Sequence, residues 1–378
     1  MELQKQTYII NQTVYFFKYA INYVKEIKIM YTNGFLLNKI DFMFHRDSFL
    51  THHSHIYLSR EDYQRVESYD VDTKYSTDMM IGVIGEFFER EILVNTNKIR
   101  NNILTGVNIL TGESRQTDVG NIVFDNKFVD SCGMASHTNS QQLIKKAVYE
   151  FYERQSFIFS FLSRGNSKKI LLDWVADPEI LCHHKYILNF VDNVYYYEMG
   201  LLDDLKVVLC LGYGSGKVIG LGTEVTLYKA IIKAQKEVLQ NLAISCSKNN
   251  FRDIGFKYYL DDRENLYTNY FRNMKIEQFM KEYDYLENDI YVNSNIEEKT
   301  EINVYEIIRK LNKEYSIDPD IYFMGSKRYI GNLKIIKVID RKWFPHMVPK
   351  NYNENIWNNI ENITEKKLRR DIQIIPFP

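Results

Sequence analysis

A short charged signature occurs twice in this chain, each time among apolar and aromatic residues. The first copy spans residues 86–90 and has the sequence Glu-Phe-Phe-Glu-Arg, and the second spans residues 150–154 with Glu-Phe-Tyr-Glu-Arg. On a helix, side chains three or four positions apart lie on the same face. Each copy therefore predicts a helix that presents two carboxylates and one guanidinium together.

The surroundings of the first copy place its charges near the protein interior. Apolar residues and glycines precede it at 79–85 and apolar residues follow it at 92–94, which leaves the helix little polar surface. Buried carboxylates need counter-charge, because an unpaired buried ion costs several kcal/mol. Each signature offers one arginine for two glutamates, and a divalent cation could supply the missing charge. The residues alone leave three hypotheses open: a magnesium-nucleotide site, a buried structural network, or ordinary surface ion pairs worth about 0.2–0.5 kcal/mol each.

Composition indicates an ordinary globular protein. The chain has 378 residues, of which 45% are apolar and 26% charged, and this length suits two or three domains or one large domain with an internal duplication. A net charge of −1 favours neither nucleic acid nor an anionic membrane as the main partner. The four scattered cysteines contain no Cys-x-x-Cys pair, which argues against a zinc site or a disulfide framework. No apolar run approaches the length of a membrane span or signal peptide, so we expect a cytoplasmic protein.

Three helices are predicted to carry the charged residues. They span about residues 77–93, 141–162 and 225–244, and the third presents Glu237 and Gln240 on one face. Strand pairs are predicted over 119–129, 206–222 and 322–339, and peripheral polar helices over 251–320. Residues 1–65 have no clear periodicity.

Several other motifs have weaker functional interpretations. Residues 214–217 resemble a phosphate loop, but Leu211 and Val218 stand where that motif needs glycine and a hydroxyl residue, so we interpret this segment as a hairpin turn. The small residues of 130–140 could contact a phosphate at the start of the second helix or could simply cap that helix. His137 within this segment could cap, pack or transfer protons. The histidines at 52, 53 and 55 lack a spaced partner for metal binding.

With these three helices in order, the chain resembles the YcaO family of ATP-dependent peptide-modifying enzymes. The resemblance covers about residue 70 to the end. The motifs that carry it are Gly-Glu-x-x-Glu-Arg at 85–90, a small-residue loop with Asp-x-Cys-Gly at 130–133, Phe-x-Glu-Arg-Gln-Ser at 151–156, Glu-x-x-Gln at 237–240 after a glycine-rich strand end, and Pro-Phe-Pro at 376–378. Two positions depart from the family pattern: Gly82 replaces a common serine, and Ile374 replaces the first proline of Pro-x-Pro-x-Pro.

The resemblance implies a fold and a set of site residues. The fold is α+β, a single large domain over 66–378 with an internal pseudo-duplication, in which helices carrying the ATP site pack on mixed or antiparallel sheets and 1–65 form a separate N-terminal segment. Magnesium is expected on Glu86, Glu89, Glu150 and Glu153. The same four residues are expected to hold ATP together with Arg90, Arg154, Glu237 and Gln240.

The implied activity is cyclodehydration of a ribosomally synthesised precursor peptide in bacteriocin or antibiotic biosynthesis. A Cys, Ser or Thr side chain attacks the preceding carbonyl, ATP phosphorylates the amide oxygen, and loss of phosphate leaves a thiazoline or oxazoline. Pro376 and Pro378 are candidate catalytic residues, because they stiffen the tail and a free carboxylate after them could act as a base. Expected partners are a separate leader-binding protein and a flavin dehydrogenase. Thioamide or amidine formation and a non-catalytic scaffold role remain alternatives.

Overall fold

The structure is a computed structural model. It describes residues 5–9, 14–19, 26–31, 41–43, 53–57, 67–71, 77–94, 103–124, 127–174, 177–252, 266–287, 290–292, 301–327 and 332–378. All statements below concern these residues.

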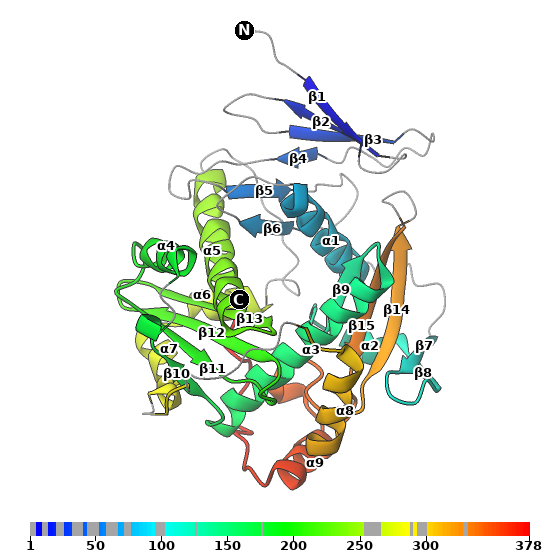
Figure 1. Cartoon of the computed structure of the whole chain (residues 1–378), viewed down its shortest axis with the longest axis vertical. Coiled ribbons are helices and arrows are strands. Elements are labelled where there is room, and N and C mark those ends of the chain that lie inside the picture. The colour runs from blue at the N-terminus through cyan, green and yellow to red at the C-terminus, as the bar shows by residue number, and fades with distance from the viewer. Residues whose placement is uncertain are drawn as a thin grey trace.

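Two antiparallel sheets form the frame of the molecule (Figure 1). The five-stranded sheet has the order β8-β7-β14-β15-β9, with β7 at Ile103–Asn108, β8 at Ser114–Asp118, β9 at Met134–His137, β14 at Asp320–Lys327 and β15 at Leu333–Ile339. The four-stranded sheet follows chain order, with β10 at Lys168–Ile170, β11 at Asn193–Glu198, β12 at Lys206–Tyr213 and β13 at Lys217–Glu224. The predicted strand pair over 322–339 is confirmed by the antiparallel pairing of β14 with β15.

Further strands lie before the first helix. β1 at Lys5–Ile9, β2 at Val14–Tyr19, β3 at Glu26–Tyr31 and β4 at Asp41–Met43 form one sheet, and β5 at His53–Tyr57 pairs with β6 at Glu67–Val71. The β5–β6 pairing joins residues on both sides of position 65, and the domain boundary placed there stays a prediction. His53 and His55 lie on β5, and His52 lies outside the described residues.

Helices cover the sheets. The α-helices are α1 at Thr77–Val94, α2 at Val119–Val123, α3 at Ser140–Ser163, α4 at Pro178–Ile187, α5 at Leu227–Arg252, α6 at Leu266–Asn273, α7 at Ile276–Tyr283, α8 at Val304–Tyr315 and α9 at Glu354–Thr364. Single 3-10 turns occur at Leu172–Trp174, Asp284–Leu286 and Pro349–Asn351. The three predicted charge-bearing helices correspond to α1, α3 and α5. Among the described helices, none is long and apolar enough to cross a membrane.

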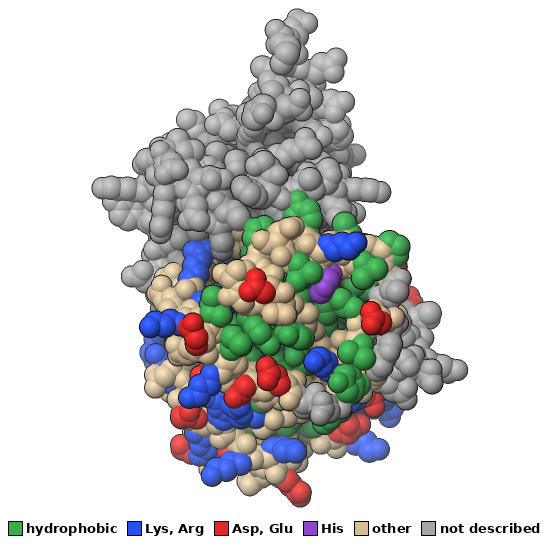
Figure 2. Space-filling model, turned by 90° about the vertical axis from the view of Figure 1, so that its left-hand side faces the viewer, with side chains coloured by type: hydrophobic (Ala, Val, Ile, Leu, Met, Phe, Trp, Pro, Cys, Tyr) green, Lys and Arg blue, Asp and Glu red, His purple; other side chains and the backbone are tan. Residues whose placement is uncertain are grey.

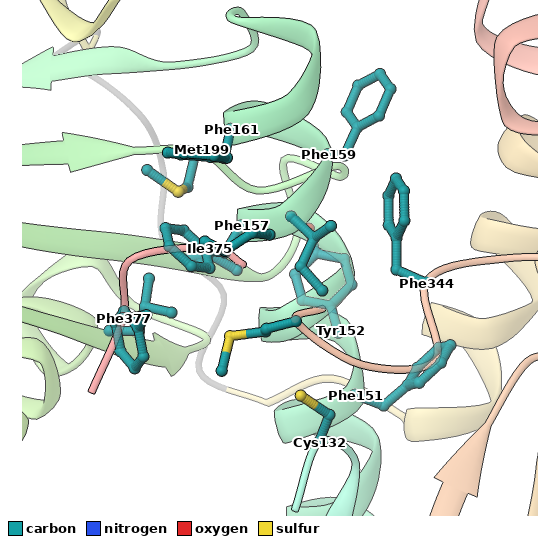
Figure 3. Close-up of a cluster of buried hydrophobic side chains, with 14 of the residues drawn as sticks. Cys132, Phe151, Tyr152, Phe157, Phe159, Phe161, Met199, Phe344, Ile375 and Phe377 are labelled. Atoms are coloured by element: carbon teal, nitrogen blue, oxygen red, sulfur yellow. The ribbon is translucent and has the colours of Figure 1, made fainter. Parts of the chain in front are cut away.

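Helix α3 lies at the centre of the main core. It contacts β9 and β15 of the five-stranded sheet and β12 and β13 of the four-stranded sheet. Most of its side chains are buried, including Tyr152, Phe157 and Phe161 (Figure 3). Helix α1 packs on β9 and β15, and α5 packs on β12 and β13. The two sheets therefore hold α1 and α5 on either side of α3.

The predicted strand hairpin over 119–129 is wrong, because residues 119–123 form the short helix α2. Asp118 caps this helix by accepting a hydrogen bond from the backbone N–H of Gly120 at 2.7 Å, and Phe124 ends it in a left-handed conformation. Only Ile122 and Val123 of this helix are buried. The periodicity of a short apolar stretch does not distinguish a strand from a helix. Here the cap that Asp118 provides favours the helix.

The helices between 251 and 320 are less peripheral than predicted. Within the described part of this range, α6, α7 and α8 contribute Phe271, Phe279 and Leu311 to the main core. Each helix is polar on most of its surface and apolar on one narrow face. The average polarity of this part of the sequence therefore conceals the buried face of each helix.

The hairpin interpretation of the glycine-rich turn is confirmed. Tyr213 pairs with Lys217 at the end of the antiparallel β12–β13 ladder. Gly214 has a φ of +130°, which L side chains rarely adopt. The turn chemistry therefore explains the glycine without a bound phosphate.

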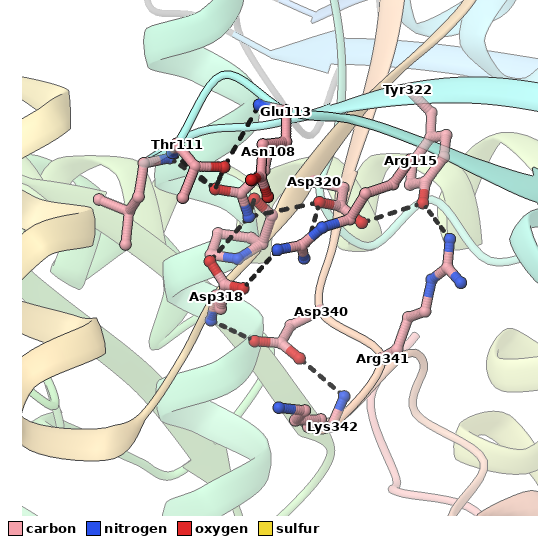
Figure 4. Close-up of polar contacts among 12 residues, drawn as sticks. Asn108, Thr111, Glu113, Arg115, Asp318, Asp320, Tyr322, Asp340, Arg341 and Lys342 are labelled. Carbon is pink, nitrogen blue, oxygen red and sulfur yellow. Dashed lines mark hydrogen bonds and ion pairs between the residues drawn. The ribbon is translucent and has the colours of Figure 1, made fainter.

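A polar network fastens the β7–β8 hairpin to the start of β14 (Figure 4). The Asn108 amide donates to Asp318 at 2.7 Å, and Arg115 forms ion pairs with Asp318 at 2.9 Å and Asp320 at 3.2 Å. The Asp318 backbone N–H donates to Asp340 at 2.6 Å. These bonds hold β7 and β8 against β14 in the five-stranded sheet.

Charged side chains of both signs are interspersed on the described surface visible in Figure 2. This distribution fits the net charge of −1. It gives that face no broad basic surface for a polyanion.

Removing the Gln155 amide should destabilise the fold. This buried side chain donates to the Phe344 carbonyl at 2.8 Å and accepts from the Phe344 N–H at 3.0 Å. Gln155→Met leaves both backbone groups without this partner, so we expect a loss of about 2–4 kcal/mol in the free energy of unfolding, measured by urea denaturation. Gln141→Met, at an exposed position on the same helix, is the control. Equal stability of the two variants would contradict this account.

Candidate functional site

Helices α1, α3 and α5 converge on a cavity of about 710 Å³. This volume lies within the range of small-molecule sites. All the residues predicted to bind nucleotide or metal line it: Glu86, Glu89, Arg90, Glu150, Glu153, Arg154, Glu237 and Gln240. Their roles stay predictions, but the structure brings the three predicted helical motifs to one place.

The α1 side of the cavity depends on close packing against β9. A Cβ atom at Gly85 would lie 2.5 Å from the Ser136 Oγ, so glycine lets the helix approach the strand. The Ser136 side chain is thereby placed to hydrogen-bond Glu89. Glu86 forms an ion pair with Arg90 at 2.6 Å on the same helix.

Burial and mutual repulsion disfavour ionisation of three carboxylates in the cavity. The pKa of Glu89 is raised to about 7, first by burial and also by repulsion from Glu86, while the hydrogen bond with Ser136 opposes the shift. Burial also raises the pKa of Glu150 well above its usual range, against the attraction of Arg154 and with the repulsion of Glu89. The pKa of Glu237 is raised to about 7, first by burial. The cavity therefore favours a ligand that brings positive charge to these carboxylates.

Arg154 connects the helices across the cavity. Its Nη2 lies 3.5 Å from Glu237 and its Nε lies 3.9 Å from Glu153. Burial lowers the pKa of Arg154, but Glu237 and Glu153 outweigh this effect and the pKa stays above its ordinary value. The Nη1 atom is buried without a hydrogen-bond partner. Arg154 therefore has a donor available for a ligand in the cavity.

The glycine-rich end of β13 places α5. A Cβ atom at Gly222 would collide with backbone atoms of Ala230 and Ala234, so only glycine allows the helix to lie this close. Glu237 accepts a hydrogen bond from the backbone N–H of Leu221 on β13. This bond fixes one carboxylate oxygen while the other faces Arg154.

The donors in the cavity suit magnesium carried by a polyphosphate. Among the described residues, no three His, Cys, Asp or Glu side chains are grouped closely enough to hold a metal ion by themselves. Magnesium is commonly bound through one or two carboxylates together with substrate phosphates. Lys145, Lys146 and Lys233 also line the cavity and provide positive charge for phosphate oxygens. The oxygen donors and the raised carboxylate pKa values fit this mode of binding.

The segment before α3 is a strand and a cap. Residues 134–137 form β9, which pairs with β15. Asn139 accepts hydrogen bonds from the N–H groups of Gln141 and Gln142 at 2.9 and 3.1 Å, and the His137 Nδ1 accepts from the Asn139 N–H at 2.8 Å. This geometry favours capping over a phosphate contact at the start of α3.

A buried charge network at the cavity wall was missed by sequence reasoning. The fully buried Lys337 ammonium donates to the Asp130 carbonyl at 2.6 Å. The Asp130 carboxylate accepts from the Tyr267 hydroxyl at 2.5 Å and from the Met347 N–H at 3.3 Å. The one available signal was a lysine inside the apolar strand 333–339.

The two candidate prolines occupy different environments. Pro378 lines the cavity, whereas Pro376 is buried and is not among the lining residues. The Pro376 carbonyl accepts a hydrogen bond from the Tyr283 hydroxyl at 3.0 Å. The structure therefore brings Pro378 to the site and gives Pro376 a supporting position in the tail.

Solved structures share this architecture. No protein-family model and no curated protein sequence matches the chain. A chain of the E. coli microcin synthetase McbBCD complex with pro-MccB17 bound superposes with a TM-score of 0.68 at 18% identity, over 92% of this chain and 99% of that one. YcaO from Methanopyrus kandleri, bound with AMPPCP and Mg²⁺, gives 0.60 at 13% identity, over 76% and 81%. The heterocyclase TruD gives 0.51 at 13% identity, over 72% and 39%.

These similarities confirm the predicted fold class, a single α+β domain with helices on antiparallel sheets. Within that class, the chain has the YcaO fold.

The raised carboxylate pKa values predict a pH-dependent stability. Folding raises the pKa of Glu89 and Glu237 from 4.5 to about 7. Their contribution to the free energy of unfolding is therefore fully present below about pH 4.5 and is lost as the pH rises through about 7. We expect Glu89→Gln to gain up to about 3 kcal/mol of stability relative to the parent as the pH rises from about 5 to about 8, measured by urea denaturation. Glu306→Gln, at a half-exposed position on α8, should show no such gain. Parallel curves for parent and Glu89→Gln would refute the assignment.

Proposed function

We propose that this protein is an ATP- and Mg²⁺-dependent cyclodehydratase that forms thiazoline or oxazoline rings in a ribosomally synthesised precursor peptide. The observation that carries the proposal is the convergence of carboxylates with raised pKa values, an arginine whose buried Nη1 donor is available, and Pro378 on one cavity. The M. kandleri structure with AMPPCP and Mg²⁺, and the microcin synthetase structure with pro-MccB17, support the same class of ligands.

The nucleotide would occupy the end of the cavity formed by α1, α3 and α5. Glu86, Glu89, Glu150 and Glu153 would hold Mg²⁺, and Arg90, Arg154, Glu237 and Gln240 would orient ATP. A bound Mg²⁺ offsets negative charge on the phosphoryl group being transferred. Binding should strengthen as the pH rises through about 7, because the carboxylates must be ionised to bind the metal.

The chemistry requires positioning more than a protein nucleophile. A peptide thiol or hydroxyl gives up its proton to solvent and forms a bond to the preceding carbonyl carbon, and the amide oxygen takes the γ-phosphoryl group as its bond to ADP breaks. Departure of phosphate, with loss of the amide proton, leaves the C=N bond of the ring. The protein must bring two substrates together and exclude water. Pro378, which lines the cavity, would border the peptide.

The partner proteins and the reaction product distinguish cyclodehydration from the alternative activities. A distinct leader-binding protein would deliver the precursor, and a flavin dehydrogenase would oxidise azolines to azoles. The direct test combines the protein, Mg²⁺, ATP and the precursor and partner encoded by neighbouring genes, followed by mass spectrometry. Loss of one water per ring supports cyclodehydration, whereas replacement of oxygen by sulfur in a parallel reaction supplied with sulfide indicates thioamide formation. An unchanged peptide mass would reject the proposal.

A carboxylate substitution tests the nucleotide site. Glu86→Gln removes a proposed metal ligand and its charge, so we expect Mg²⁺-dependent ATP turnover to fall by at least about 100-fold, measured as phosphate release with precursor present. Glu306→Gln, on α8 and paired with Arg309, should keep parental turnover. A parent protein without turnover would favour the scaffold alternative, and full activity of Glu86→Gln would contradict the site.

A further inference from the structure

The aromatic ring of Phe377 lies between the arginine of the cavity and the apolar core. The guanidinium carbon of Arg154 is 4.8 Å from the centre of this ring. The ring centre of Phe157 is 5.2 Å away. Phe377 is only 1% exposed, so the cation lies against the ring in a site with little water, where this kind of contact is strongest.

The contact restricts the orientation of Arg154. Glu153 and Glu237 approach the edges of the guanidinium, at 3.9 and 3.5 Å, while Phe377 packs against the group. A planar cation that is stacked and paired at its edges has few other orientations. The buried Nη1 is the atom left without a partner, and the stack therefore determines where this donor points.

The same residue is fixed within the tail. The Ile375 N–H donates to the Met347 carbonyl at 3.1 Å, and the Phe377 N–H donates to the Ile375 carbonyl at 2.9 Å. The Pro376 carbonyl is held by Tyr283. Pro378 follows directly at the cavity wall. A displacement of the ring would move both the proline and the arginine.

We infer that Phe377 is a positioning residue that couples nucleotide binding to the placement of the Pro378 tail. This coupling rests on the proposed nucleotide site, and it links Arg154 in that site to the Pro378 tail. A nucleotide that contacts Arg154 favours the stacked arrangement and thereby orders the tail. By thermodynamic reciprocity, an ordered tail increases nucleotide affinity by the same factor.

A pair of matched substitutions tests the coupling. Phe377→Leu removes the ring that stacks on Arg154, and Phe157→Leu removes a ring from the same apolar cluster that packs on Phe377 instead. Binding of AMPPCP with Mg²⁺ is measured by calorimetry on the full chain. We expect Phe377→Leu to weaken binding by at least about 5-fold, with Phe157→Leu within about 2-fold of the parent. Equal weakening in both variants would reduce Phe377 to a packing role and overturn the inference.

Hydrogen exchange gives a second readout, on the parent protein and on Phe377→Leu. Adding AMPPCP and Mg²⁺ should slow amide exchange at residues 374, 375 and 377, and this protection should be lost in Phe377→Leu. Nucleotide binding without tail protection would overturn the coupling while leaving the proposed function in place. A parent protein that binds no AMPPCP would instead overturn the proposed function, and the coupling with it.

Discussion

The central constraint of this structure is the burial of helix α3 between two sheets. Apolar side chains such as Phe157 and Ile158 face the core along most of the helix. Charge can be accommodated only where the helix meets the cavity, and there Glu150, Glu153 and Arg154 are placed. Helices α1 and α5 flank α3 because each packs on one of the two sheets. The cavity thus arises from how the sheets hold three helices, while the motif residues give it its charge.

The charge balance of the cavity suits the binding of a divalent cation. Raising a carboxylate pKa from 4.5 to about 7, as at Glu89, corresponds to about 3 kcal/mol disfavouring the ionised form. Arg154 offsets part of the charge of Glu153 and Glu237. A Mg²⁺ ion carried by a nucleotide would offset more, so the folded protein carries an electrostatic cost that metal binding can relieve. Such strained carboxylates are common at functional sites and less common in networks that only stabilise a fold.

The sequence predicted the parts of the site that depend on local spacing. The three helices and their charged faces follow from intervals of three and four residues, and the β12–β13 hairpin follows from its glycine turn. Helix α2 was missed because an aspartate cap decided a short ambiguous segment. The Asp130–Lys337 bond joins residues 207 positions apart, so no local pattern could predict it. The burial of Pro376 likewise depends on Tyr283, which lies in a helix far from the tail in sequence.

Two routes of contact fix the tail at the cavity, and they begin on different elements. In one, Lys337 holds Asp130, Asp130 accepts the Met347 N–H, and the Met347 carbonyl accepts the Ile375 N–H. In the other, Glu237 on α5 pairs with Arg154, which stacks on Phe377. The first route runs through buried hydrogen bonds, and it sets the course of the tail. The second route joins Arg154, which lines the cavity, to the buried Phe377 of the tail.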